Sequence, residues 1–280
     1  TLGKIRTSET YAATLCSFRR FREDKDVPFD DMDSDMMMAY EAYLKNNGVS
    51  PNSSSFYMRN LRAVYNRAVE KGLTSQRFPF KHVYTGVDKT VKRAVPLKVI
   101  KRIKEMDFSM NPSFDFARDM FLMSFYTRGM SFVDMAYLRK KDLQNGVLSY
   151  RRRKTGQQLF IKWEKCMQEI VNKYDTSQSN YLLPIIKPFG DIDERKQYIY
   201  AAHNINRCLK IIGKELGLSV SLTLYVARHA WASIAKSKNV PLSVISEGMG
   251  HDSEATTRIY LASLDTVAID KANSMILKSL

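Results

Sequence analysis

The sequence predicts a mainly helical protein of two domains, with one small β-hairpin in the second. Apolar residues recur at helical spacing in most segments, while a single stretch, 147–163, is rich in the residues that strands prefer. The chain has 280 residues, enough for two domains of ordinary size. Hydrophobic residues make up 44%, so each domain can bury its own core.

Three helices are expected in the first domain, residues 1–88. Thr7 can cap the first helix, and Glu9 in its first turn suits the positive end of the helix dipole. Apolar side chains recur every three or four residues and predict its buried face: Tyr11, Leu15, Phe18 and Phe21.

The second and third helices carry clear end signals. Asn47 and Gly48 close the second helix. Ser50 can cap the third, Pro51 fits its first turn and Gly72 its end. The predicted core stripe of the third helix is Tyr57, Leu61, Val64, Tyr65 and Ala68. Three arginines stand off that stripe and either contact phosphates or solvate the helix face: Arg59, Arg62 and Arg67.

A linker is predicted at 89–96, because this stretch lacks apolar periodicity and ends in Pro96. The second domain, residues 97–280, then opens with a helix at Pro96 or Leu97, since proline suits the first helical turn. Further helices are expected where the helical period recurs: 113–126, 164–174, 193–217, 224–239, 241–250, 253–264 and 265–280.

The exception is 147–163, which predicts a β-hairpin. Two short runs rich in Val, Tyr, Phe and Ile flank Thr155 and Gly156, the predicted turn. Near the tip, four consecutive basic residues are expected to project outward: Arg151, Arg152, Arg153 and Lys154. They would either contact a phosphate backbone or simply keep the turn soluble.

The charge balance predicts an anionic partner. Lys and Arg number 44 against 29 Asp and Glu, a formal net charge of +15. Residues 1–90 hold 14 and 11 of these, a net of +3, so the rest of the chain carries +12. Nucleic acid is the leading candidate, with a membrane surface second.

No membrane span, signal peptide or metal site is expected. The chain has no run of about 18 apolar residues, and its start, TLGKIRTSET, has no apolar core. Cys16, Cys166 and Cys208 lack metal-ligand spacing and fit reduced thiols in the cytoplasm. The four histidines are also scattered, so neither a metal nor another cofactor is predicted.

Tyrosine and the basic residues could together break a phosphodiester without a metal. This reaction needs a nucleophile, cations for the non-bridging oxygens and a proton source for the leaving oxygen. Tyr can be the nucleophile, Arg can bind phosphate through two parallel hydrogen bonds, and Lys or His can transfer a proton.

Four motifs, in order, resemble those of the tyrosine recombinases, the phage integrases of bacterial mobile elements. The segment 126–143 looks like the first motif of that family, and Lys154 falls at the position of its hairpin lysine. TLYVARHAWASIA is similar to the His-x-x-Arg helix, with Arg228 as the arginine. EGMGHDSEATTRIYL resembles the box that holds a histidine and the nucleophile, here His251 and Tyr260. The helical first domain resembles the core-binding domain.

Two positions depart from the pattern of the family. Tyr225 stands at the first position of the His-x-x-Arg helix, where its hydroxyl could still bond phosphate. Aligned on Asp134, Ser131 occupies the slot of the first arginine. Arg128, three residues earlier, would share a face with Ser131 on a continuous helix and is the predicted substitute. The competitors come from the hairpin: Arg152 and Arg153.

The resemblance implies a mechanism. Tyr260 would attack the scissile phosphate, forming a 3′-phosphotyrosyl link and freeing a 5′-hydroxyl. Arg228 and Arg128 would hold the non-bridging oxygens, Lys154 would protonate the leaving oxygen and His251 would donate to the phosphate, with Tyr225 beside it. Because the ester conserves the bond energy, neither ATP nor a metal is required.

The resemblance also implies the partners. The substrate would be double-stranded DNA, clamped between the two domains, with no small-molecule substrate and no membrane. Strand exchange would proceed in a tetramer in which the last helix, DKANSMILKSL, docks on a neighbouring protomer.

Three other functions remain open. The departures at Ser131 and Tyr225 would suit a DNA-binding protein that kept the fold and lost the chemistry. A type IB topoisomerase shares the same active-site logic. A basic helical RNA-binding protein would account for the charge, though not for the ordered motifs.

Overall fold

The computed structural model of the chain describes residues 5–88, 93–187, 192–261 and 274–277, except for the side chains of Ile259 and Tyr260. The described part is mainly helical with a small antiparallel sheet, as predicted. It divides into two compact units, 1–90 and 91–280, each with its own hydrophobic core.

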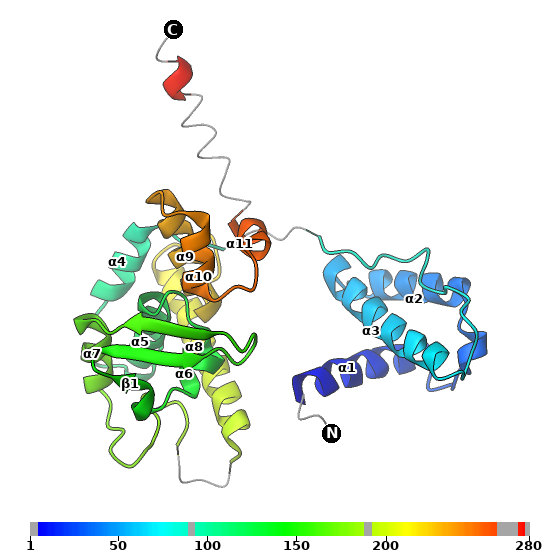
Figure 1. Ribbon diagram of the computed structural model, residues 1–280, viewed down its shortest axis with the longest axis horizontal. Coiled ribbons are helices and arrows are strands. Elements are labelled where there is room, and N and C mark those ends of the chain that lie inside the picture. Colours follow the sequence, from blue (N-terminus) through cyan, green and yellow to red (C-terminus); the bar gives the residue numbers. More distant parts are fainter. Residues whose placement is uncertain (1–4, 89–92, 188–191, 262–273, 278–280) are drawn as a thin grey trace. The chain divides into compact units, whose positions relative to one another are not determined.

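Over residues 5–88, the N-terminal unit forms three α-helices, coloured blue to cyan in Figure 1: α1 (Ile5–Phe21), α2 (Ser34–Asn46) and α3 (Pro51–Glu70). A short 3-10 helix, η1 (Phe29–Asp31), lies between α1 and α2. Large apolar side chains fill the core, among them Met37, Tyr40, Met58 and Tyr65.

The predicted ends of α2 and α3 are confirmed. Asn47 follows the last residue of α2, and Gly48 has a φ of +71°. Ser50 Oγ accepts a hydrogen bond from Ser53 N at the start of α3, and Gly72 lies just beyond its end.

The predicted start of α1 is wrong, because the helix already includes Ile5, so Thr7 lies within the helix rather than at its cap and Glu9 lies beyond the first turn. Its predicted buried face is also partly wrong, since Tyr11 and Leu15 are exposed. Polar side chains pack in their place: Thr14 and Ser17. Both are satisfied by hydrogen bonds, from an asparagine of α3 and a tyrosine of α2, so counting apolar positions misses this face.

The solvent side of α3 carries the predicted arginines. Arg59 and Arg67 are exposed, while Arg62 is half-buried and donates to Thr85 Oγ1 at 3.2 Å. Val64, predicted in the core stripe, is exposed. The stripe is otherwise buried at Leu61, Tyr65 and Ala68.

The C-terminal unit runs through α4 (Leu97–Glu105), α5 (Pro112–Tyr126), α6 (Phe132–Ala136), η2 (Lys140–Asp142), β1 (Leu143–Gln144), β2 (Val147–Arg151), β3 (Gln158–Lys162), α7 (Lys165–Asn172), α8 (Glu194–Glu215), α9 (Leu224–Ser237), α10 (Leu242–Met249) and α11 (Glu254–Leu261). The predicted helices are confirmed as far as α11. The helix predicted over 265–280 lies mostly outside the described residues, of which 274–277 are helical. None of the described helices is long and apolar enough to cross a membrane.

The sheet has the order β1-β2-β3, and both strand pairs are antiparallel. The predicted hairpin is therefore confirmed, with Val147 opposite Lys162 and Arg151 opposite Gln158. Strand β1 was not predicted, because two residues are too few to show an alternating pattern. Alternate residues of β2 and β3 face the core: Leu148, Tyr150, Leu159 and Ile161.

Helix α5 lies at the centre of this core. It contacts α4, α7, α8 and α9, and its side chains share one cluster with the buried face of the sheet. Figure 1 shows the green strands beside α5 and α8. This packing brings the end of α5, the hairpin, α9 and the end of α10 together, and the candidate site is built there.

Candidate active site

The turn after α5 corrects one prediction. Arg128 and Ser131 do not share a continuous helix, because α5 ends at Tyr126 and Arg128 adopts a left-handed φ of +60° before α6 begins at Phe132. Ser131 instead caps α6. Its Oγ accepts from Asp134 N at 3.4 Å and donates to Asp134 Oδ2 at 2.6 Å, so its hydroxyl is engaged within the turn.

Gly129 lets this turn lie directly against α9. Its φ is +74°, and a Cβ atom placed on it would lie 2.7 Å from Arg228 Cα, so no side chain fits without movement of the backbone. The carbonyl oxygen of Gly129 accepts a hydrogen bond from Arg228 Nη1 at 2.7 Å. The absence of a side chain at Gly129 thus brings Arg228 to the turn.

Arg228 joins three segments. Only 6% of the residue is exposed. Besides its bond to Gly129, the guanidinium donates to Met249 O at the end of α10 and lies 2.9 Å from His251 Nε2. The orientation of this planar group is therefore set before any ligand binds.

His251 is held as an acceptor. An arginine can only donate, so His251 Nε2 accepts from Arg228, and the proton lies on Nδ1, which donates to Thr257 Oγ1 of α11 at 2.7 Å. Burial lowers the pKa of His251 to about 4, assisted by the charges of Arg228, Arg152 and Lys154. A neutral imidazole therefore lies in a positive field that favours an anionic ligand.

Arg152 points into the protein, which contradicts the prediction that it projects outward. It continues the strand alternation that buries Leu148 and Tyr150, and it is 6% exposed. Its Nη1 donates to Gly250 O, in the turn between α10 and α11. Its Nε lies 4.0 Å from Asp134 Oδ2, close enough for an ion pair but too far for a hydrogen bond.

The other basic residues of the hairpin tip are exposed as predicted: Arg151, Arg153 and Lys154. Arg153 lies over the ring of Tyr137 at 3.9 Å, and its backbone N donates to Asp134 Oδ1 at 2.9 Å. Asp134 thus anchors the hairpin to α6. Sequence reasoning used this residue only to align a motif and missed its role as an anchor.

Three polar atoms at the hairpin tip are buried and have no hydrogen-bond partner within the described part of the chain: Arg152 Nε, Thr155 Oγ1 and Gln157 Oε1. Buried polar atoms are usually paired. Gln157, which sequence reasoning did not single out, also approaches Gly250, where a Cβ atom would lie 3.2 Å from its Oε1. These three atoms lie beside a positively charged pocket, where a polar ligand could form hydrogen bonds with them.

Arg128 approaches the same region less closely. Its Cδ lies 3.6 Å from where a Cβ of Gly248 would be. The pKa of Tyr150 is raised mainly by burial, and three cations oppose that shift, in the order Arg152, Arg228 and Arg128. Arg128 is thus near the site, but of the three arginines it has the weakest electrostatic effect on the pKa of Tyr150.

Of the two tyrosines predicted in the site, the structure describes the side chain of Tyr225 but not that of Tyr260. Tyr225 is exposed on α9, one turn before Arg228, and its ring packs edge-to-face on His229 with centroids 4.6 Å apart. Tyr260 belongs to α11, but its side chain lies outside the described part of the chain. Its helix is tied to the site through Thr257, which accepts from His251 Nδ1.

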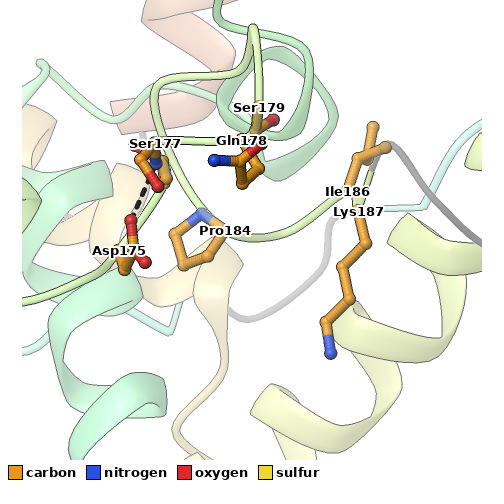
Figure 2. Close-up of a pocket in the computed structure, with 8 residues that line it drawn as sticks. Asp175, Ser177, Gln178, Ser179, Pro184, Ile186 and Lys187 are labelled. Carbon is orange, nitrogen blue, oxygen red and sulfur yellow. Dashed lines mark hydrogen bonds between the residues drawn. The ribbon is translucent and has the colours of Figure 1, made fainter.

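No metal centre is found among the described residues, where no three His, Cys, Asp or Glu side chains gather. A cavity of about 280 Å³ lies elsewhere, between the loop 175–179 and the segment 184–187 (Figure 2). There Asp175 accepts from Ser177 N, and Lys187 extends along another wall. None of the predicted catalytic residues lines this cavity.

Two family models match the chain. Residues 1–83 match the phage integrase SAM-like domain, and residues 96–266 match the phage integrase family. The second match spans more than half of the chain, so the chain belongs to the phage integrase family. Members of this family are tyrosine recombinases, enzymes that break and rejoin DNA, which confirms the resemblance seen in the sequence.

Solved structures share the fold. The XerH site-specific recombinase in a post-cleavage complex with a palindromic difH substrate has a TM-score of 0.70 at 16% identity, over 95% of this chain and 78% of that one. A lambda integrase dimer bound to a COC' core site has a TM-score of 0.69 at 16% identity, over 93% of this chain and 90% of that one. The Tn1549 transposon integrase in complex with transposon right end DNA has a TM-score of 0.65 at 16% identity, over 92% of this chain and 90% of that one. A search of curated proteins gave no match.

Proposed function

We propose that this recombinase is a site-specific integrase of a mobile element, which cleaves and rejoins DNA through a 3′-phosphotyrosyl intermediate. The observation that carries the proposal is the convergence of Arg228, Arg152 and His251 on the turn that leads into α11, the helix that includes Tyr260. Two buried guanidinium groups and an imidazole beside a tyrosine helix are the parts that phosphoryl transfer to tyrosine needs.

In this mechanism Tyr260 Oη loses its proton to water as it attacks the scissile phosphorus, and the bond from phosphorus to the 5′ oxygen breaks. The proton of the leaving oxygen comes from Lys154, which stands exposed at the hairpin tip within the electrostatic reach of His251. A 5′-hydroxyl from a second strand then attacks the phosphotyrosyl ester and releases the tyrosine. Bond energy is conserved, so the reaction needs neither a nucleotide cofactor nor a metal.

Arg228 and Arg152 bind the non-bridging oxygens in this proposal. Arg152 is favoured because it is fixed on Gly250 O next to His251, while its buried Nε still has no hydrogen-bond partner in the described part of the chain. Arg128 is the alternative, since its long side chain also approaches the turn at Gly248.

His251 changes its role when a phosphate binds. In the free site its Nε2 accepts from Arg228, so it cannot donate to an oxygen there. Burial and, after it, the neighbouring cations lower the pKa of His251; a bound phosphate anion opposes the effect of the cations, so binding raises this pKa and favours the protonated imidazole, whose Nε2 donates. Tyr225, exposed one turn before Arg228, supplies a further hydroxyl.

Double-stranded DNA is the proposed partner, and the enzyme acts on it in the cytoplasm. The exposed Arg59 and Arg67 of α3, together with Arg62 and the hairpin's Arg153, contact its phosphates. Arg152, first predicted as a DNA contact of this kind, serves in the phosphate pocket instead. Protomers assemble as a tetramer through the C-terminal helix, whose described residues 274–277 are exposed.

One observation favours a second candidate, a DNA-binding protein that has lost the chemistry: Ser131, in the slot of the first arginine, is engaged as a helix cap. A type IB topoisomerase-like enzyme is the third candidate. It would relax supercoiled plasmid without preference for a site.

The test uses nicked suicide duplexes made from the DNA that flanks the gene of this protein, with products separated on a denaturing gel. The wild type is expected to form a covalent protein–DNA band that Tyr260→Phe lacks. Tyr200→Phe, at an exposed tyrosine of α8, is the matched control and should retain the band. Tight duplex binding without any covalent band would favour the DNA-binding candidate.

A further inference from the structure

Phe78 has a backbone conformation that is unfavourable for a bulky residue. Its φ is +52°, in the left-handed region that bulky residues avoid, and it precedes Pro79, which restricts its backbone further. Its side chain is 66% exposed, so little packing within the unit offsets that cost. Asparagine or glycine would adopt this conformation more easily.

The loop around Phe78 is held firmly on the core of the N-terminal unit. The buried Tyr65 donates through its hydroxyl to Ser75 O at 2.9 Å. Arg77 Nη1 donates to Asp30 O at 2.9 Å, and Phe78 N donates to Gln76 Oε1 at 3.0 Å. The aromatic ring is therefore presented to solvent from a fixed position.

Phe78 forms part of the wall of a groove of about 230 Å³. Two residues of α3, Arg62 and Asn66, line it, together with Gln76 and Lys81 from the loop. None of the residues that line the groove is acidic. The groove thus combines two cations and two side-chain amides around an aromatic ring.

We propose that Phe78 contacts DNA directly, with its ring against bases and sugars while Arg62 and Lys81 hold phosphates beside it. The proposal rests on the proposed function. DNA is the occupant because it presents anionic phosphates next to apolar base and sugar surface, and the groove offers cations next to an aromatic face. Gln76 Nε2 donates to Asn66 Oδ1 at 3.3 Å, which orients the Asn66 amide so that its N–H groups can donate to base edges. The strained backbone at Phe78 is then retained for this contact rather than for folding.

The test compares Phe78→Asn with the wild type in the full chain, using fluorescence anisotropy on the duplexes described above and thermal unfolding. Asparagine accepts the left-handed conformation, so the Tm should stay unchanged or rise. Affinity for the duplex should fall about tenfold, as for loss of one aromatic stacking contact. The salt dependence of binding should not change, because no charge is removed.

Two variants serve as controls. Leu73→Asn removes an apolar side chain that is 61% exposed in the same unit but outside the groove, and it should leave affinity unchanged. Lys81→Gln removes a charge and should lower the slope of log K against log salt by about 1.

The proposal is overturned if Phe78→Asn binds the duplex like the wild type, or if its Tm falls, which would make the ring a structural part of the fold. Unchanged DNA binding with an altered oligomeric state would assign Phe78 to a protein contact instead. If the wild type binds no duplex at all, the proposed function itself fails, and this outcome is distinct from a wild type that binds with Phe78 uninvolved.

Discussion

Two arginines of the C-terminal unit and two of the N-terminal unit are held in opposite ways. Arg228 and Arg152 are almost fully buried and donate to backbone carbonyl groups. Arg59 and Arg67 stand exposed on α3, and Arg67 lies 3.8 Å from an equally exposed Glu70. A buried, fixed guanidinium can stabilise charge that develops in a transition state, whereas exposed cations give a screened attraction that tolerates substitution. Position, more than charge, therefore separates the two groups of arginines.

The largest effect is expected from Arg228→Lys, which should slow formation of the covalent complex by about 100- to 1,000-fold. A lysine ammonium cannot bond Gly129 O and Met249 O while presenting a planar pair of donors to phosphate. Single-turnover cleavage of the suicide duplex measures the rate. Arg67→Lys makes the same chemical change at an exposed position and should alter the rate less than about twofold. Similar losses in the two variants would contradict the comparison.

Within the site, Arg152→Gln and Arg128→Gln test which arginine completes the phosphate pocket. Arg152→Gln should reduce the cleavage rate about 100-fold, whereas Arg128→Gln should cost less than about tenfold. Both rates are to be read at saturating duplex, so that weaker binding is not mistaken for slower chemistry. The reverse ranking would assign the pocket to Arg128.

The close approach that positions Arg228 can be tested through stability. Gly129→Ala should lower the free energy of unfolding by about 2–4 kcal/mol, because the new methyl group would meet the backbone of α9. Gly146→Ala is the matched control. Gly146 has a similar φ of +72° but open space around it, so its variant should lose about 1 kcal/mol from backbone strain alone. Urea unfolding of both variants measures the difference, and equal losses would show that the turn can move away from α9.

Local signals predicted most of the fold. The third helix, for example, was bounded by Ser50, Pro51 and Gly72, because caps and helix stops depend on adjacent residues. The buried face of α1 was misjudged, since the hydrogen bonds that satisfy Thr14 and Ser17 come from other helices. A pattern within one segment contains no information about those partners.

The candidate site shows the same division. Motif spacing predicted that Arg228 and His251 belong to one site, and in the structure Arg228 Nη2 lies 2.9 Å from His251 Nε2. The inward direction of Arg152 depends on strand register across the hairpin, and the break between Arg128 and Ser131 depends on two consecutive positive φ angles. These features arise from how α9 and the hairpin pack, so the sequence of one motif could not reveal them.

His251 allows a smaller effect, on pH dependence, to be predicted with a definite sign. Its pKa is about 4 in the folded protein against 6.5 for the ordinary group, so the unfolded chain binds a proton that the native site does not. The contribution to stability is complete above pH 6.5 and is lost as the pH falls toward 4. In His251→Gln, the free energy of unfolding should therefore decline less between these pH values, as measured by urea unfolding. A decline equal to that of the wild type would contradict the buried, neutral imidazole.

The same group reports on the phosphate that the site is proposed to bind. In an NMR titration of the imidazole, duplex that places a phosphate beside Arg228 should move the pKa of His251 upward, because the anion offsets the cations that depress it. Cations such as those of α3 only lower the pKa of a histidine, so they cannot account for an upward shift. A His251 pKa that stays near 4 on tight binding would mean that DNA is held by the exposed arginines while the buried pocket remains empty.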